Sequence, residues 1–346
     1  MPAFGIFDHI DKQSRPLSET YADRLRVLEL ADAAGFYSYH LAEHHATPLC
    51  MAPSPSIFLA ALAQRTTRLR FGPLVYLLPM YDPLRLIEDV CMLDQLSNGR
   101  LDMGVGRGIS PIELGIHGIN PAETPARFRE ALEVLLAGLS LQPGERLNHA
   151  GQYYTFSNVP VELTPAQRPH PPVWYATSGP DRMPWLAERG YNTVVQGPAA
   201  RVQPLLARYW EAWSQHHAAD APRPKFGILR TIFLADTDAA ARALARPAFK
   251  QHYQSLTKLW VEHNMPTAAE SFVDDLDDEI RDDKAYVGSP ATVRDQLARF
   301  IEATGCEYVV ARLMFGDLTR DELLHSVNLF VHEVMPSFQP SIAALA

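Results

Sequence analysis

Cysteine is scarce in this chain of 346 residues, and the three cysteines that occur are far apart. Cys50, Cys91 and Cys306 are an odd number and form no C-x-x-C pair. This pattern argues against a disulfide framework and against a cysteine-based zinc site. It fits a protein of a reducing compartment.

Long apolar runs and basic clusters are also missing. No stretch reaches the ~18 apolar residues that a membrane span needs, and the first residues show neither a basic start nor an apolar segment. We therefore expect a cytoplasmic protein with no membrane contact. The net charge is -9 and no block of Lys and Arg occurs, which argues against nucleic acid because phosphate binding needs clustered cations. Small-molecule chemistry is the better expectation.

A repeated pattern of helix, glycine and strand predicts the fold. An apolar helical pattern stops at a glycine and a β-prone run follows in three segments: 28–43, 185–197 and 300–313. Gly35, Gly190 and Gly305 suit the left-handed position that ends a helix. Further strands are predicted at 4–9, 69–78, 100–105, 173–177 and 226–234. Such alternation indicates a parallel sheet with right-handed crossovers.

The strand candidates fit an α/β fold, a (β/α)8 TIM barrel with insertions, formed by residues 1–346 as a single domain. The chain is longer than the ~250 residues of a typical barrel. We interpret 141–172, rich in proline and aromatics, as an excursion over the active-site mouth, and 263–285 as an insertion before the last strand-helix unit. The acidic run within 263–285 is typical of a solvated surface. A doubly wound open sheet is the rival fold.

The segment FYSYHLAEHH, residues 36–45, is the strongest candidate for a site. It is a β-prone aromatic run that ends in Glu43, His44 and His45. In parallel α/β proteins the carboxyl ends of the strands form the functional face, so these three side chains are expected beside a ligand.

Two further stretches could hold an anionic or flat ligand. Gly104, Gly106 and Gly108 follow a predicted strand, but their G-x-G-x-G spacing is one residue short of the dinucleotide fingerprint. Glycines there let the backbone approach a ligand closely, and Arg107 adds a permanent cation. Ser178 and Gly179 are a second candidate, because they follow a strand and precede a helix predicted to begin near Asp181, and backbone N–H groups at such a helix start bind phosphate.

These motifs occur in an order that resembles the bacterial luciferase-like flavin monooxygenases. The resemblance is carried by five segments: 37–45, 68–108, 171–190, 286–313 and 327–338. It implies a TIM barrel that binds reduced FMN at its carboxyl face and activates dioxygen for attack on a small organic substrate. It also implies that His44 is catalytic and that Arg107 and Ser178 bind the flavin phosphate.

The resemblance extends the expected site and its partners. It places a non-prolyl cis peptide at Leu74 and Val75, and it adds Thr177 and Gly179 to the cofactor-binding residues. Histidine is the side chain best suited to proton transfer near neutral pH, and Glu43 or His45 could orient His44. Because no credible dinucleotide motif exists, we expect a separate flavin reductase as partner, and we expect a homodimer.

Several alternatives stay open at this point. Gly106 stands where the light-emitting luciferases have a cysteine, so light emission is not assumed. A deazaflavin-dependent oxidoreductase on the same barrel is the first alternative. A metal-dependent hydrolase with His40, His44 and Glu43 as ligands is the second, although further ligands on later strand ends are missing. A flavin-binding subunit without catalysis is the third.

Overall fold

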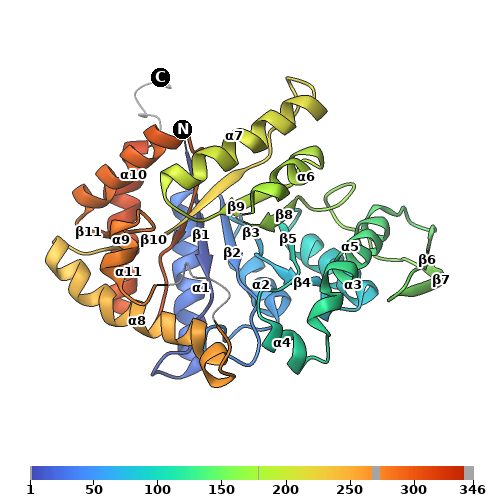
Figure 1. Cartoon of the computed structure of the whole chain (residues 1–346), viewed down its shortest axis with the longest axis horizontal. Coiled ribbons are helices and arrows are strands. Elements are labelled where there is room, and N and C mark those ends of the chain that lie inside the picture. Colours follow the sequence, from blue (N-terminus) through green and yellow to red (C-terminus); the bar gives the residue numbers. More distant parts are fainter. Residues whose placement is uncertain (1, 178, 267–272, 339–346) are drawn as a thin grey trace.

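Parallel strands at the centre of the molecule form a barrel, and helices surround it (Figure 1). The computed structural model describes residues 2–177, 179–266 and 273–338. The barrel strands are β1 (Ala3–Asp8), β2 (Ser38–Leu41), β3 (Arg70–Pro73), β4 (Tyr76–Leu77), β5 (Met103–Gly106), β8 (Val173–Ala176), β9 (Asn192–Val195), β10 (Phe226–Leu234) and β12 (Tyr308–Arg312). Their order around the sheet is β3-β2-β1-β12-β10-β9-β8-β5-β4. The predicted TIM-barrel class is thus confirmed.

The ring closes through a strand that is broken in the middle. Phe71 of β3 forms a parallel bridge with Leu101, and Tyr76 of β4 pairs with Val105 of β5. The break between β3 and β4 is the Leu74–Val75 peptide bond, which is cis as expected. The sequence predicted one strand over 69–78, and the structure divides it at this bond.

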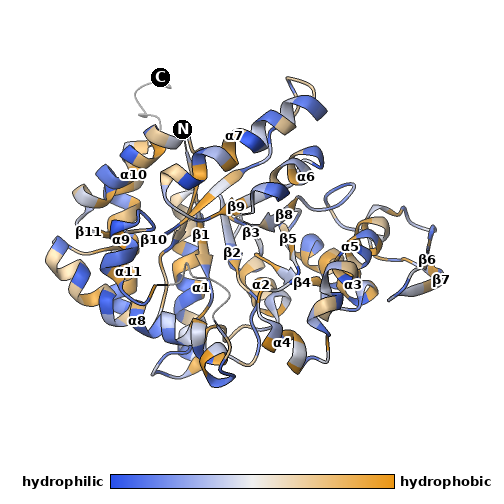
Figure 2. Cartoon of the chain, in the orientation of Figure 1, coloured by the Kyte–Doolittle hydropathy of each residue, from blue (hydrophilic) through white to orange (hydrophobic). Residues whose placement is uncertain are grey.

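Helices cover the outside of the barrel. They are α1 (Leu17–Ala34), α2 (Pro55–Ala63), α3 (Pro83–Leu96), α5 (Thr124–Ser140), α6 (Met183–Glu188), α7 (Ala199–His216), α8 (Asp238–Glu262), α10 (Pro290–Thr304) and α11 (Arg320–Leu329). These helices alternate hydrophobic and hydrophilic residues along their length (Figure 2), as expected for helices with one face on a sheet. Gly35, Gly190 and Gly305 have φ values of 83°, 65° and 66°, so the predicted left-handed residues after three helices are confirmed.

The barrel interior is filled by aromatic side chains. Trp174 and Tyr308 are fully buried there, and the Tyr308 hydroxyl is 2.8 Å from Nε2 of His40. A Cβ atom on Gly5 or on Gly227 would collide with the Tyr308 ring. Two strands therefore carry glycine at this level so that one large ring can fit, and the lower barrel is a packed core without space for a ligand.

Shorter elements lie in the connections. They are α4 (Pro111–Ile116), α9 (Leu276–Arg281), β11 (Ala285–Gly288), the hairpin β6 (Arg146–Ala150) with β7 (Thr155–Pro160), and the single turns η1 (Leu78–Met80), η2 (Pro121–Glu123), η3 (Pro180–Arg182), η4 (Phe330–Val334) and η5 (Met335–Phe338). Sequence reasoning missed the hairpin and β11. β11 pairs with the end of β10, at Thr231 to Leu234, and the predicted insertion at 263–285 contains α9 together with residues outside the described ranges.

The predicted excursion at 141–172 does not lie over the mouth in the described structure. It joins α5 to the amino-terminal end of β8, so it starts from the opposite end of the barrel. Its hairpin runs beside α5, where the Glu130 carboxylate accepts hydrogen bonds from the backbone N–H groups of residues 152–154. None of residues 141–172 lines the pocket at the mouth. The excursion predicted over the mouth is therefore corrected, because a segment that leads from a helix to the start of a strand lies at the amino-terminal end of the barrel.

Candidate active site

A pocket opens at the carboxyl ends of β2, β4, β5 and β8, with a volume of about 360 Å³. Its apolar wall includes Phe7, Leu74, Val75, Leu77, Met80 and Leu114. Its polar lining includes Glu43, His44, Arg107, Ser110, Glu113 and Thr177. The carboxyl face thus brings together residues that the sequence places far apart, as expected for a barrel.

His44 is oriented by Glu113, a residue that sequence reasoning missed. The His44 Nδ1 atom is 3.0 Å from one Glu113 carboxylate oxygen, and the His45 backbone N–H donates to the other at 2.7 Å. Burial alone would raise the Glu113 pKa, but the hydrogen bond and charge of His44 and the N–H of His45 outweigh it, so this pKa lies below its usual range. An ionised Glu113 fixes the proton of His44 on Nδ1 and leaves Nε2 for a reacting group.

His45 and Glu43 form a second pair, of which Glu43 also lines the pocket. The His45 Nε2–H donates to Glu43 at 2.9 Å, and the other Glu43 oxygen accepts from the Tyr81 hydroxyl at 2.8 Å and from the Leu77 backbone at 3.3 Å. Burial lowers the His45 pKa, but the hydrogen bond and charge of Glu43 outweigh it, and the net shift is upward. Among the hydrogen bonds of the described residues, neither Glu43 nor His45 contacts the His44 side chain. The expectation that one of them orients His44 is therefore wrong.

Glycine residues form one side of the pocket. A Cβ atom on Gly106 would collide with the Val75 side chain, and one on Gly104 with the carbonyl oxygen of Pro73. The backbone of β5 thus lies directly against the cis peptide of Leu74 and Val75. Glycine at these positions permits the close approach of β5 to residues 73–75, and Gly106 and Gly108 line the pocket.

Arg107 and Thr177 enter the same pocket from neighbouring strands. Arg107 forms no hydrogen bond or ion pair with any described residue, so its charge is available to a ligand. The Thr177 Oγ1 accepts from the backbone N–H of Gly179 at 3.2 Å, which shapes the turn before η3. Ser178, the other predicted phosphate ligand, lies outside the described residues.

Comparison with known proteins decides the family. The model of the luciferase-like monooxygenase family matches residues 2–307. The chain belongs to this family.

Relatives of this luciferase-like monooxygenase match it from end to end. It is 39% identical to the uncharacterized protein y4wF of Sinorhizobium fredii over 96% of both chains. It is 26% identical to the oxygenase component of the flavin-dependent trigonelline monooxygenase of Acinetobacter baylyi, over 98% of this chain and 96% of that one. The crystal structure of the monooxygenase RslO1 from Streptomyces bottropensis superposes with a TM-score of 0.85 at 26% identity and covers 97% of this chain and all of RslO1. The chain is a flavin-dependent monooxygenase of the luciferase-like type.

The metal-hydrolase alternative does not suit this luciferase-like monooxygenase. His40 lies inside the barrel against Tyr308, whereas His44 and Glu43 pair with Glu113 and His45 at the mouth. Within the described residues, no group of three or more His, Cys, Asp or Glu side chains could hold a metal ion. Likewise, none of the helices in the described ranges has the length and apolar character of a membrane span.

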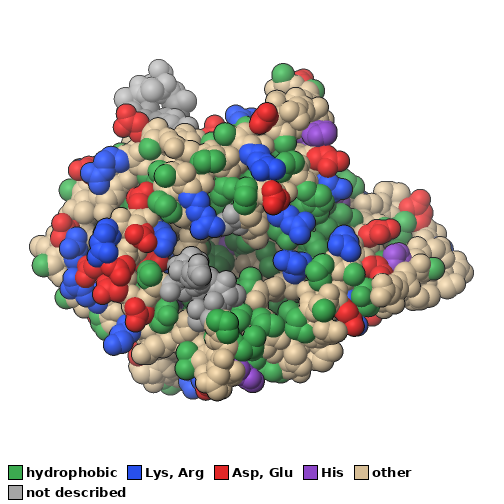
Figure 3. Space-filling view, in the orientation of Figure 1, with side chains coloured by type: hydrophobic (Ala, Val, Ile, Leu, Met, Phe, Trp, Pro, Cys, Tyr) green, Lys and Arg blue, Asp and Glu red, His purple; other side chains and the backbone are tan. Residues whose placement is uncertain are grey.

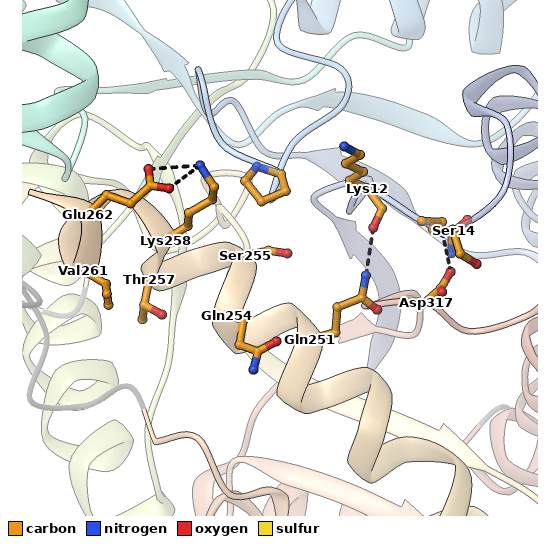
Figure 4. A pocket seen from close by; sticks show the side chains of 12 residues that line it. Lys12, Ser14, Gln251, Gln254, Ser255, Thr257, Lys258, Val261, Glu262 and Asp317 are labelled. Atoms are coloured by element: carbon orange, nitrogen blue, oxygen red, sulfur yellow. Dashed lines mark hydrogen bonds and ion pairs between the residues drawn. The ribbon is translucent and has the colours of Figure 1, made fainter.

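A larger hollow beside α8, about 610 Å³, carries none of the predicted site residues (Figure 4). Some of its polar groups are already paired with one another: Lys258 with Glu262 at 2.9 Å, and the Gln251 amide with the Lys12 carbonyl at 3.0 Å. The smaller pocket, where Gly106, His44 and the unpaired Arg107 of this luciferase-like monooxygenase meet, is therefore the candidate active site.

Proposed function

We propose that this chain is the oxygenase of a two-component system. It would take reduced FMN from a separate flavin reductase and use dioxygen to oxygenate a small organic substrate. The observation that carries the proposal is the single pocket in which the His44–Glu113 pair faces a glycine-rich surface beside the unpaired Arg107. The name of the A. baylyi relative, an oxygenase component, supports the need for a partner.

The pocket residues fit a flavin. The backbone at Gly106 and Gly108 would contact the planar ring, while Arg107, with Thr177 and Gly179, would hold the phosphate. A guanidinium group suits a phosphate because it donates several hydrogen bonds in one plane. When bound, the reduced flavin supplies electrons and reacts with dioxygen, and the protein supplies position and a dry surrounding.

His44 is the proton-transfer group in this proposal. With its Nδ1 proton held by Glu113, its Nε2 atom can accept a proton from the reacting oxygen or return one. The apolar wall around it, including Leu77 and Leu114, would keep bulk water from competing for that proton. His45 and Glu43 would stabilise the loop and the start of η1 instead.

An anaerobic titration tests the cofactor assignment. Purified protein would be titrated with reduced FMN, oxidised FMN and a reduced deazaflavin, with flavin fluorescence and absorbance as readouts. We expect reduced FMN to bind most tightly and NADH alone to support no rapid flavin reduction. Tightest binding of the deazaflavin would favour the alternative oxidoreductase, and rapid NADH-driven turnover by the purified chain would contradict the two-component proposal.

Three remaining expectations are proposals as well. The chain would be a homodimer, which sedimentation equilibrium measures directly. It would be cytoplasmic, which fits Cys50, Cys91 and Cys306 as three buried free thiols. It would not bind nucleic acid, and on the face shown in Figure 3 acidic and basic side chains are interspersed.

A further inference from the structure

The last turns of α8 contact the His44–Glu113 pair, although the proposed chemistry does not use them. α4 and the end of α8 lie side by side at the lower edge of the molecule in Figure 1. A second, small cavity lies between α8 and the pair, and it shares four residues with the active-site pocket: His44, Ile109, Ser110 and Glu113. The wall that α8 contributes consists of Leu256, Leu259 and Trp260. The end of α8 therefore borders the pair directly.

The loop that carries His44 is tied to α8 by a hydrogen bond. The Thr47 hydroxyl donates to the Ser255 carbonyl at 2.8 Å, and both residues are buried. The same hydroxyl oxygen accepts from the Leu49 backbone N–H at 3.3 Å. Because a carbonyl can only accept, the direction of the bond to Ser255 is fixed. This bond holds the loop at a defined distance from α8.

The helix that carries Glu113 is tied to α8 by apolar packing. Ile112 packs with Leu259 and Trp260 in a buried cluster that is separate from the main core of the described residues. α4 has only six residues, and isolated helices shorter than ~12 residues are marginal in water. The position of α4 therefore depends on tertiary contacts, and the contact of Ile112 with Trp260 is one of them.

The cavity between α8 and the pair is too small for a ligand. Its volume is about 10 Å³, at the lower limit of the ~10–15 Å³ that one water needs. Trp260 is the largest side chain in the α8 wall of this cavity. A smaller side chain there would leave room for water, and water at the Glu113 carboxylate would compete with His44 for its hydrogen bond. Trp260 therefore keeps this side of the pair dry.

We propose that Trp260 is a positioning residue for the His44–Glu113 pair. It acts through Ile112, which holds α4 in place, and through the closed space beside Glu113, which excludes water from the hydrogen bond to His44. Thr47 ties the loop of His44 to the same stretch of α8, so residues 255–260 set the position of both members of the pair. This inference rests on the proposed function and adds to it a residue that does not line the active-site pocket.

The pair needs such support because its two members belong to different connections of the barrel. His44 follows β2, and Glu113 belongs to α4 after β5. Only their 3.0 Å hydrogen bond holds the His44 proton on Nδ1. If α4 moved away, the imidazole would exchange between its two neutral forms, and the fraction with a free Nε2 acceptor would fall. A misplacement of ~1 Å at a reacting group can lower a rate about a hundredfold.

The test removes each of the two ties to α8. Trp260→Leu opens the space beside Glu113, Trp260→Phe keeps an aromatic ring there, and Thr47→Val removes the hydrogen bond to Ser255. The matched control is Trp213→Leu, because Trp213 of α7 is also buried but, in the described structure, lines neither of the two cavities. Thermal unfolding verifies that each variant is folded. Should Trp260→Leu not fold, Trp260→Phe and Thr47→Val carry the same readouts.

The first readout is the protonation pattern of the His44 ring in the full chain without flavin. Nitrogen-15 NMR shifts distinguish a ring nitrogen with a proton from one without, and His44→Gln identifies the signal by its absence. At alkaline pH, where imidazole is neutral, we expect one form with the proton on Nδ1 in the parent and a mixture of both forms in Trp260→Leu. Thr47→Val should give a smaller change in the same direction, and Trp260→Phe and Trp213→Leu should stay close to the parent.

The second readout is turnover, measured as peroxide release after reduced FMN is mixed with dioxygen. Trp260→Leu should lower turnover roughly tenfold, with the affinity for reduced FMN unchanged. In a Glu113→Gln background the same substitution should have little further effect, because the carboxylate whose position it sets is gone. Equal losses in both backgrounds, an equally large loss in Trp213→Leu, or a parent-like His44 ring in both Trp260→Leu and Thr47→Val would overturn the inference.

Failure of this inference and failure of the proposed function are distinguishable. A mixture of His44 forms in Trp260→Leu with parent-like turnover would support the positioning of the pair and overturn the proton-transfer role of His44. Tight binding of reduced FMN and a large loss of turnover in His44→Ala, with both readouts unchanged in Trp260→Leu, would keep the proposed function and overturn the role of Trp260.

Discussion

On the β4–β5–β8 side of the mouth, the surface includes Gly106, Gly108 and the apolar side chains of Leu74 and Leu77, and Arg107 has no partner within the described residues. On the β1–β12 side, Asp11, His252 and Arg312 are buried and paired into a chain. An unpaired cation is tolerable only where water or a ligand can reach it, whereas buried charges need partners. The first side is therefore suited to a large anionic cofactor, whereas the charged groups of the second side are already engaged with one another.

His44 lies between the two sides, so its removal gives the largest expected effect. His44→Ala should lower turnover by about a hundred- to ten-thousand-fold, the usual range for a general acid or base. Affinity for reduced FMN should change little, because the phosphate and ring contacts lie elsewhere. Stopped-flow reoxidation of reduced FMN by dioxygen, with peroxide release as a second readout, measures the change.

The control for this variant is His149→Ala. His149 pairs with Glu130 on the hairpin beside α5, and it does not line the pocket. Parent-like kinetics of His44→Ala would remove the proton-transfer role and favour a flavin-binding subunit without catalysis.

Removal of the unpaired cation, Arg107, has the second-largest expected effect. Arg107→Ala should weaken binding of reduced FMN by about 1.5–3 kcal/mol, because a charge-assisted contact to the phosphate is lost. Riboflavin has the same ring system but no phosphate, so its affinity should be the same in parent and variant. Equal losses for both ligands in an anaerobic titration would place Arg107 at the ring, and no loss for either would place the phosphate elsewhere.

The close packing of Gly106 against Val75 can be disrupted by a substitution that changes no charged residue. Gly106→Ala would force the Val75 side chain to move, and overpacking of this kind costs about 1–3 kcal/mol. We expect weaker flavin binding and a lower melting temperature. Gly115→Ala in α4 is the matched control, since a Cβ atom there meets no neighbour within 4 Å, and alanine is the better helix former. Equal effects of the two variants on flavin affinity would show that the close packing of β5 is irrelevant.

Local secondary structure could be predicted from the sequence, whereas these side-chain pairs could not. The strand predicted at 226–234 coincides with β10, and the positive φ of Gly305 follows from the helix that it ends. Both features depend on neighbours along the chain. Even α4 had a local signal, because Ser110 and Glu113 have the S-x-x-E spacing that begins a helix.

The orienting role of Glu113 had no such signal. It lies 69 positions from His44, and only the closure of the barrel brings them together. The same holds for His252 and Asp11, which are 241 positions apart. The error over Glu43 and His45 came from the opposite cause, since adjacency in the sequence suggested a contact that the geometry of the loop does not allow.

The smallest expected effect concerns the pair of His45 and Glu43, which does not contact the His44 side chain. The pKa of His45 is raised above its ordinary 6.5. A group whose folded-state pKa is raised contributes stability that is fully present below the unfolded value and is lost as pH rises through the folded value. The cost of His45→Gln to the free energy of unfolding should therefore be largest in mildly acidic solution, roughly 1 kcal/mol. This cost should decrease as the pH rises above the pKa of an ordinary histidine. Urea unfolding of parent and variant across this pH range measures the cost.

In a Glu43→Gln background, where the main cause of the raised pKa is gone, the pH dependence of the His45→Gln cost should become weaker. A cost that grows with pH, or that is unaffected by Glu43→Gln, would mean that this pair does not stabilise the loop through its charge.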